Sequence, residues 1–222
     1  MKSLSHIFDN NARWAENTRS HDAEYFNRLV EGQRPEMLWI GCADSRVPAE
    51  IITGLEPGQL FVHRNIANVV APGDPSAQAV LQFAVDGLRV KHIIVCGHES
   101  CGGVQTALKD LADIPSGPLG GWLSHVQSAA RLHREVLAKA KSEEERERSL
   151  DGFNAIEQAA NVCRSEAVQR AWDRGQPIHV HAWLYRISSG LIQHLGFCAT
   201  GAGEALTEYQ QAVERWATAA KA

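Results

Sequence analysis

The sequence of 222 residues has no long hydrophobic run and no excess of positive charge. Its apolar stretches fall short of the roughly 18 residues of a membrane span, and its first twenty residues lack the apolar stretch of a secretory signal. Lysine and arginine number 22 against 26 aspartates and glutamates, a formal net charge of −4. We therefore expect no binding to nucleic acid or membranes, and predict a cytoplasmic protein that acts on a small molecule.

Cysteines are few, and their number is odd. They stand at positions 42, 96, 101, 163 and 198. An odd count in a chain of this length argues against a disulfide framework, so we predict reduced thiols with another use. Hydrophobic residues make up 44% and charged residues 22%, a balance typical of one globular domain.

Hydrophobic periodicity predicts an α/β fold, with a mostly parallel central β-sheet flanked by helices. Four apolar runs have the length and turn boundaries of buried strands, at residues 37–40, 60–63, 92–96 and 178–185. Between the second and third runs, Asp74 and Pro75 precede apolar residues at helical spacing over 77–88. This strand, helix and strand succession is the unit that builds parallel sheets.

Further helices are predicted at both ends of the chain and in its second half. Their ranges are 1–30, 120–140, 153–172 and 203–222, and the charged run 139–148 is interpreted as a solvated helix end or loop. We predict a single domain over 1–222, composed of an N-terminal helical arm (1–31), an α/β core (36–200) and a C-terminal helix (203–222).

Two short motifs follow predicted strands, where open α/β sheets place their ligands. They are GCADSR at 41–46 and GHESCGG at 97–103. His98 and Cys101 have a spacing that lets both side chains reach one metal, and Cys42 would complete a set of two cysteines and one histidine. Three protein ligands with an open fourth position are typical of catalytic zinc, and thiolates favour zinc over magnesium or calcium.

Asp44 and Arg46 extend the first motif. Asp44 would either bind the metal as a fourth ligand or accept a hydrogen bond from the metal's water. Arg46 is suited to a bidentate pair with this carboxylate. Gly102 and Gly103 would bring backbone N–H groups close to the metal at the start of a helix, which favours an anion.

Each of these residues alone has a structural interpretation, because a lone cysteine is usually a small buried hydrophobe. That interpretation stands for Cys96, Cys163 and Cys198, which we expect in the core. His179 and His181 alternate along the last predicted strand and could share one face. We predict packing or hydrogen bonding for this pair, since no cysteine or carboxylate lies beside it.

The paired motifs, with 98 − 42 = 56 residues between Cys42 and His98, resemble the β-class carbonic anhydrases. LFVHRN at 60–65 and HAWLY at 181–185 agree, so that the resemblance covers about residues 14–195. It implies reversible hydration of carbon dioxide to bicarbonate and a proton, by attack of zinc-bound hydroxide. The implied zinc ligands are Cys42, His98 and Cys101, with Asp44 and Arg46 as the catalytic dyad.

The resemblance also implies a substrate hydrogen bond from Gln33 and assembly into homodimers or tetramers through the arm. In one bacterial subgroup, Asp44 moves from Arg46 onto zinc and silences the enzyme when bicarbonate occupies a second, non-catalytic pocket. The residues that match this pocket are Trp39, Arg64 and Tyr185. Their structural interpretations are a buried strand aromatic for Trp39 and a strand-end anchor for Tyr185.

Three other functions fit part of the pattern. The same fold and zinc could hydrolyse carbon disulfide or carbonyl sulfide, because access to the pocket decides the substrate. A zinc-dependent binding or sensor protein would have its site closed permanently by Asp44, which leaves no purpose for Arg46. A thiol nucleophile formed by Cys101 and His98 would leave Cys42 unexplained.

Overall fold

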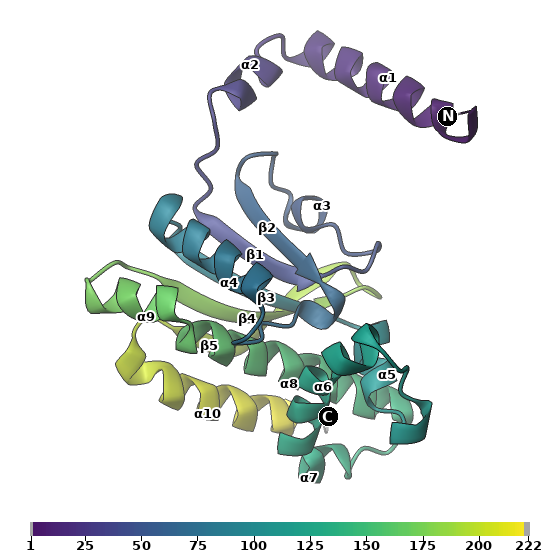
Figure 1. Ribbon diagram of the computed structural model, residues 1–222, viewed down its shortest axis with the longest axis vertical. Coiled ribbons are helices and arrows are strands. Elements are labelled where there is room, and N and C mark those ends of the chain that lie inside the picture. The colour runs from purple at the N-terminus through teal and green to yellow at the C-terminus, as the bar shows by residue number, and fades with distance from the viewer. Residues whose placement is uncertain (1, 220–222) are drawn as a thin grey trace.

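The computed structural model describes residues 2–219, and a five-stranded sheet with the order β2-β1-β3-β4-β5 lies at its centre (Figure 1). The strands are β1 (Met37–Cys42), β2 (Leu60–Asn65), β3 (His92–His98), β4 (His179–Arg186) and β5 (Leu191–Ala199). Neighbouring strands run parallel from β2 to β4, whereas β5 is antiparallel to β4. The predicted α/β class with a mostly parallel sheet is confirmed.

The described residues form ten α-helices around this sheet. They are α1 (Ser5–His21), α2 (Tyr25–Val30), α3 (Ala49–Thr53), α4 (Pro75–Gln82), α5 (Gly102–Ala107), α6 (Pro118–Leu132), α7 (Arg134–Leu137), α8 (Glu143–Arg164), α9 (Glu166–Asp173) and α10 (Ala202–Ala219). The Asp74 carboxylate caps α4 by accepting hydrogen bonds from two backbone N–H groups, as its sequence predicts. The Ser142 hydroxyl caps α8 by accepting a hydrogen bond from the Glu145 N–H, so most of the charged run forms the first turns of a helix.

The main core lies between one face of the sheet and the long helices. Helix α8 packs on β3 and β4, and α10 packs on β5 and on α8. The Nε1 of Trp216 in α10 donates a hydrogen bond to the Ser149 carbonyl of α8 at 2.9 Å. Large side chains buried on this face include Leu38, Ile40, Ile93, Phe153 and Ile156.

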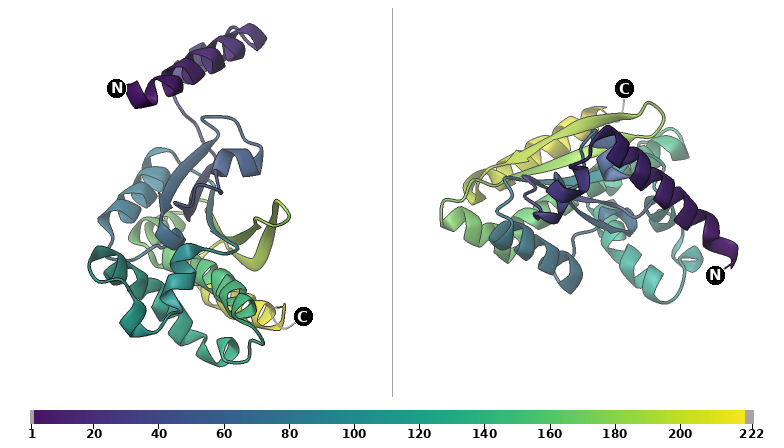
Figure 2. Two further views of the ribbon diagram at one scale, coloured as in Figure 1. Left: turned by 90° about the vertical axis from the view of Figure 1, so that its right-hand side faces the viewer. Right: turned by 90° about the horizontal axis from the view of Figure 1, so that it is seen from above.

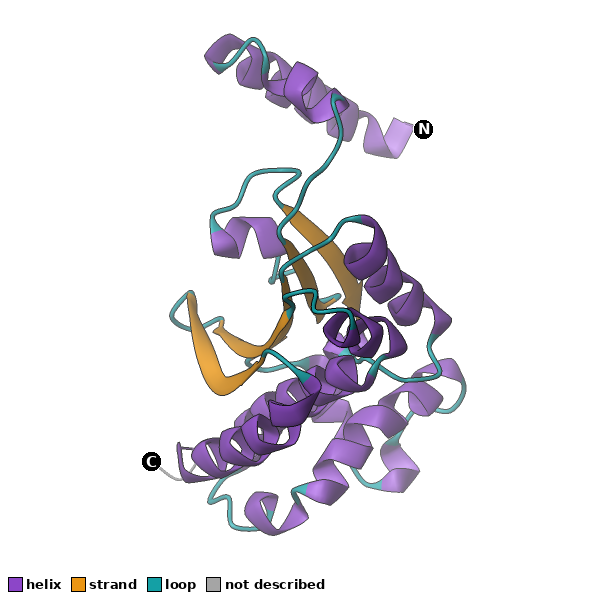
Figure 3. Ribbon diagram, turned by 90° about the vertical axis from the view of Figure 1, so that its left-hand side faces the viewer, coloured by secondary structure: helices purple, strands orange, loops and turns teal. Residues whose placement is uncertain are grey.

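The opposite face of the sheet has much less cover from its own chain. A small apolar cluster there comprises Trp39, Ala49, Leu60, Ile94 and Cys96, with short helix α3 over it. Figure 3 shows that most helices gather on the other side of the sheet. This second face therefore stays open over much of β4 and β5.

The N-terminal arm stands apart from the sheet (Figures 1 and 2). Helices α1 and α2 bury none of their residues, and contacts between them include Trp14 edge-on to Phe26 at 5.6 Å. The arm exposes large apolar side chains, among them Ile7, Phe8 and Val30. Its predicted helical character is confirmed from residue 2 onward, and Met1 lies outside the described residues.

Several predicted elements differ from those of the structure. Strand β5 was not predicted, and Cys198 on it is half-buried, so its assignment to the core was wrong. The predicted helix 120–140 is interrupted at His133, and the predicted helix 153–172 at Ser165, whose extended backbone separates α8 from α9. The last three residues of the predicted C-terminal helix lie outside the described range. None of the described helices combines the length and apolar character needed to cross a membrane.

Gly152 provides a test of the packing between α8 and α10. A Cβ atom at this position would lie 2.2 Å from the Trp216 ring, whereas a Cβ at Gly121 in α6 would have no heavy atom within 4 Å. We expect Gly152→Ala to lower the free energy of unfolding by about 1–3 kcal/mol, because the ring must move. Gly121→Ala should raise it by about 0.5–1 kcal/mol through helix propensity.

Equilibrium unfolding in urea measures both changes. Opposite signs for the two glycine substitutions are the expected result, since both replace a helical glycine by the best helix former. If Gly152→Ala also raised the free energy of unfolding, the close approach of Trp216 to Gly152 would be contradicted.

Candidate metal centre and active site

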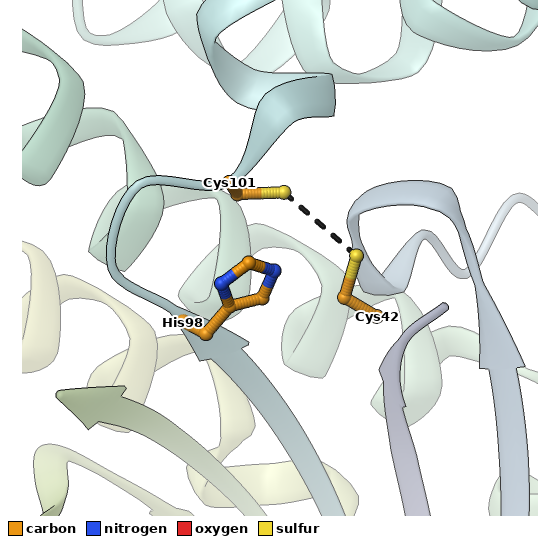
Figure 4. Close-up of side chains that lie close together, drawn as sticks. All are labelled: Cys42, His98 and Cys101. Atoms are coloured by element: carbon orange, nitrogen blue, oxygen red, sulfur yellow. Dashed lines mark hydrogen bonds between the residues drawn. The ribbon is translucent and has the colours of Figure 1, made fainter. Parts of the chain in front are cut away.

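The ends of β1 and β3 bring three metal-binding side chains together (Figure 4). Because Gly41 pairs with Cys96 in parallel register, Cys42 and His98 end neighbouring strands at the same edge of the sheet. Cys101 follows as the residue before α5. The sulfur atoms of Cys42 and Cys101 are 3.9 Å apart, and these two atoms and a His98 ring nitrogen lie within 4.8 Å of one another.

The His98 ring is oriented as a metal ligand would be. Its Nδ1 lies 2.9 Å from the Glu99 carbonyl, which can only accept, so the proton sits on Nδ1. The Nε2 atom is then a free acceptor, and it is buried without a hydrogen-bond partner. Two sulfurs bound to one tetrahedral zinc at about 2.3 Å lie about 3.8 Å apart, close to the spacing of Cys42 and Cys101. The residues present therefore fit zinc.

The two thiols differ in their acidity. A hydrogen bond from the Cys101 thiol lowers the pKa of Cys42 despite its burial. The hydrogen bond to Cys42, together with burial, raises the pKa of Cys101. The backbone N–H of Ala67 also donates to the Cys42 sulfur at 3.4 Å. The pair thus holds one negative charge readily, and a bound cation would favour loss of the second proton.

Asp44 forms a bidentate ion pair with Arg46. The Arg46 Nε and Nη2 atoms donate to the two carboxylate oxygens at 3.0 and 2.7 Å, and the Arg46 backbone N–H donates at 2.9 Å. These hydrogen bonds hold the pKa of the Asp44 carboxyl well below its usual range. Its Oδ2 atom also lies 3.9 Å from His98 Nε2. An ionised carboxylate is therefore fixed at the edge of the cysteine and histidine cluster.

Arg64 supports the same loop from β2. Its Nε donates to the Cys42 carbonyl at 2.8 Å, and its Nη2 donates to the Asp44 carbonyl. Trp39 and Tyr185 line a narrow space beside Cys42 and His98 that leaves no room for a water molecule. Arg64 does not line this space, so the structure does not gather the three residues in one pocket.

Gln33 and Gly102 occupy very different positions. Gln33 is exposed in the linker between α2 and β1, and among residues 2–219 no hydrogen bond joins it to the cluster. Gly102 begins α5, with open space where a Cβ would stand. At Gly103 a Cβ would come within 2.8 Å of Ile66, so packing requires that glycine. Glu99 turns toward the hydroxyl of Ser188, which donates to it at 2.7 Å.

Two further features of the site were not apparent in the sequence. Ser100 adopts a left-handed backbone conformation with φ of 55°, and its carbonyl accepts a hydrogen bond from Arg46 at 3.2 Å. Asp151 of α8 lies buried behind Cys101, and burial raises its pKa well above the usual value. No local motif marks Asp151, because helix α8 reaches the site only through tertiary packing.

Comparison with known proteins places this geometry in a family. The family model for carbonic anhydrase matches residues 37–192. The chain belongs to the carbonic anhydrases. A carbonic anhydrase of Emericella nidulans is 45% identical over 190 residues, which cover 85% of this chain and 82% of that protein. One of Pseudomonas aeruginosa is 35% identical, with 85% and 86% covered.

Solved structures identify the class as β. A tetrameric β-carbonic anhydrase from Sordaria macrospora is 36% identical, with a TM-score of 0.84 and coverage of 90% of this chain and 100% of that one. A Coccomyxa β-carbonic anhydrase in complex with acetazolamide is 34% identical, with a TM-score of 0.87 and coverage of 94% and 95%. The predicted family and enzyme class are confirmed, whereas the roles of individual residues stay predictions.

Metal content tests the ligand set. We expect the purified wild-type chain to bind one zinc ion per subunit, and Cys42→Ser to lose at least nine-tenths of it, because a serine hydroxyl is a far poorer ligand than a thiolate. Cys198→Ser is the matched control, since Cys198 lies on β5 outside the cluster. Atomic absorption on dialysed protein provides the measurement. Equal zinc content in both variants would contradict the assignment.

Proposed function

We propose that this carbonic anhydrase hydrates carbon dioxide reversibly to bicarbonate and a proton, with one zinc ion held by Cys42, His98 and Cys101. The observation that carries the proposal is the unpartnered His98 Nε2, which faces two sulfurs 3.9 Å apart. Zinc, when bound, lowers the pKa of a water ligand toward neutrality and so supplies the nucleophile. The remaining steps depend on residues of the chain.

Asp44 and Arg46 act as a unit in this proposal. The Asp44 carboxylate accepts a hydrogen bond from the reacting water and orients its lone pair toward carbon dioxide. The bidentate contact from Arg46 keeps that carboxylate ionised and restricts its rotation. The backbone N–H of Gly102 donates to the negative oxygen that develops on the substrate. Because Asp44 is paired with Arg46, the proposal favours an enzyme over a binding protein closed by Asp44.

We also propose that the enzyme works in the cytoplasm as a homodimer or homotetramer. The arm exposes Ile7, Phe8 and Trp14, and exposed apolar groups of this size favour burial against another protein surface. The relative from Sordaria macrospora is described as tetrameric.

Assembly also affects the expected role of Gln33, because its linker lies away from the cysteine and histidine cluster of its own chain. A substrate hydrogen bond from Gln33 would therefore be made to the site of another copy.

A regulatory role for bicarbonate forms the second part of the proposal. Arg64 is a cation that donates to the carbonyls of Cys42 and Asp44, and Trp39 and Tyr185 line the narrow space beside Cys42. Bicarbonate bound by these three residues would draw the Arg64 guanidinium away from the loop. Asp44 would then be free to exchange Arg46 for the metal, which inhibits hydration.

Substitutions in the Asp44 and Arg46 pair test the catalytic proposal. Arg46→Lys loses the bidentate geometry, so we expect kcat/KM for carbon dioxide hydration to fall about tenfold, and Asp44→Asn to lower it about a hundredfold. Zinc content should be retained in both. Arg170→Lys is the control, since Arg170 forms ion pairs on α9 far from the loop.

Stopped-flow hydration assays on zinc-loaded protein measure these effects. Carbon disulfide and carbonyl sulfide, assayed beside carbon dioxide, identify the preferred substrate. Wild-type kcat/KM in zinc-loaded Arg46→Lys would contradict the role of the pair. Zinc-loaded wild-type protein without hydration activity would overturn the proposed function itself.

Arg64→Gln tests the regulatory proposal. Loss of a charge-assisted contact to an anion costs about 1.5–3 kcal/mol, so the bicarbonate concentration for half-inhibition should rise roughly 10- to 100-fold. Arg89→Gln is the control, because Arg89 is an exposed arginine bonded to Gln176 on the surface. Hydration rates measured against added bicarbonate give the result. Unchanged inhibition in Arg64→Gln would exclude the second site.

A further inference from the structure

A second cluster of metal-ligating side chains lies at the opposite end of the sheet. His92 is the first residue of β3, His179 is the first of β4, and these two residues are register partners. His181 lies two residues further along β4 and therefore on the same face. Six residues of strand separate His92 from His98, which places this cluster about 20 Å from the catalytic ligands.

The three rings are close enough to share one ion. One nitrogen of each lies within 4.8 Å of the others, and His92 Nδ1 is 3.1 Å from His181 Nε2. Two imidazole nitrogens on a tetrahedral zinc at about 2.0–2.1 Å lie about 3.3 Å apart, so the closest pair already has the spacing of two ligands. The ring centroids of His92 and His179 are 5.1 Å apart.

A hydrogen bond between His92 and His181 accounts for part of this geometry only. This hydrogen bond would occupy one nitrogen of His92 and one of His181, and it would not explain the position of His179. Within the part of the chain that the structure describes, the ring nitrogens of His179 have no hydrogen-bond partner of their own. No carboxylate among the described residues is hydrogen-bonded to any of the three rings. Each neutral imidazole has one acceptor nitrogen, and a single cation could bind all three of these nitrogens.

The surroundings keep His92 and His181 in the form that binds metal. Burial, with the neighbouring histidines His92, His194 and His179, lowers the pKa of His181 to about 4. Burial also lowers the pKa of His92. Neutral imidazole is the ligand form, so no proton has to be displaced near pH 7. All three residues are half-buried. His92 points to the same face of β3 as Ile94 and Cys96, the face that the long helices leave uncovered.

We propose that His92, His179 and His181 form a second metal site, which takes a borderline divalent ion such as zinc and links β3 to β4. Three imidazoles favour zinc or copper over magnesium and calcium, which prefer oxygen ligands. Water would complete the coordination, because the set leaves a fourth position open. The ion bridges two adjacent strands at their amino ends, where it strengthens the sheet without contacting the catalytic loop.

Zinc uptake by the intact enzyme tests this site. The full chain, loaded with one zinc at the cysteine centre, is dialysed against increasing free zinc. We expect the stoichiometry to rise from one to two ions per subunit, and the midpoint of thermal unfolding to rise with it. His181→Gln and His179→Gln should remain at one ion per subunit. His194→Gln should still reach two, because the His194 Nδ1 already accepts a hydrogen bond from the Gly196 N–H.

Copper provides a spectroscopic readout that does not depend on enzymatic activity. Cu²⁺ added to the zinc-loaded chain should give an electron paramagnetic resonance spectrum with nitrogen couplings, and His181→Gln should lose them. Retention of the first zinc in each variant verifies that the fold is intact. Wild-type protein that stays at one zinc per subunit would overturn the proposal. So would a second zinc in His181→Gln and His179→Gln equal to that of the wild type.

Discussion

The parallel pairing of β1 with β3 is the constraint on which the metal centre depends. Cys42 and His98 lie 56 residues apart in the chain and share no local element. The register from Met37 with His92 to Gly41 with Cys96 places their strand ends at one edge of the sheet. A slip of one residue would turn the Cys42 side chain to the other face. The affinity of the site for metal is therefore set by the packing that fixes this register.

Electrostatic repulsion is the second constraint, because the site gathers several acidic groups where water is scarce. Two thiols and the Asp44 carboxylate lie close to the buried His98. Arg46 neutralises Asp44 directly, and Arg64 holds the backbone carbonyls of the same loop. The thiols have no such partner and share a proton instead. The arginines therefore compensate the charge of the Asp44 loop, and a metal cation would compensate the charge of the two sulfurs.

Strong local patterns made most of the sheet predictable. Strands β1 and β3 are almost continuous apolar runs, β2 begins with one, and β4 alternates. Asp74 with Pro75 marks the start of α4 in the sequence. Strand β5 was not predicted. It is an edge strand, and its polar and exposed residues, including Gln193 and His194, do not alternate regularly with apolar ones. Both ligand motifs were visible because each is short and contiguous. The place of His92 in the second cluster could not be predicted from the sequence, because only the pairing of β3 with β4 sets it beside His179.

The difference in burial between the two clusters matches what the charges of the proposed ligands require. Two thiolates cancel the charge of a divalent ion, so Cys42, His98 and Cys101 can hold it where they are almost fully enclosed. Three neutral imidazoles leave the full charge of the ion, which is costly to remove from water. A site made of three histidines is therefore stable only where solvent or an anion can reach the ion. The half-buried position of His92, His179 and His181, on the uncovered face of the sheet, meets that requirement.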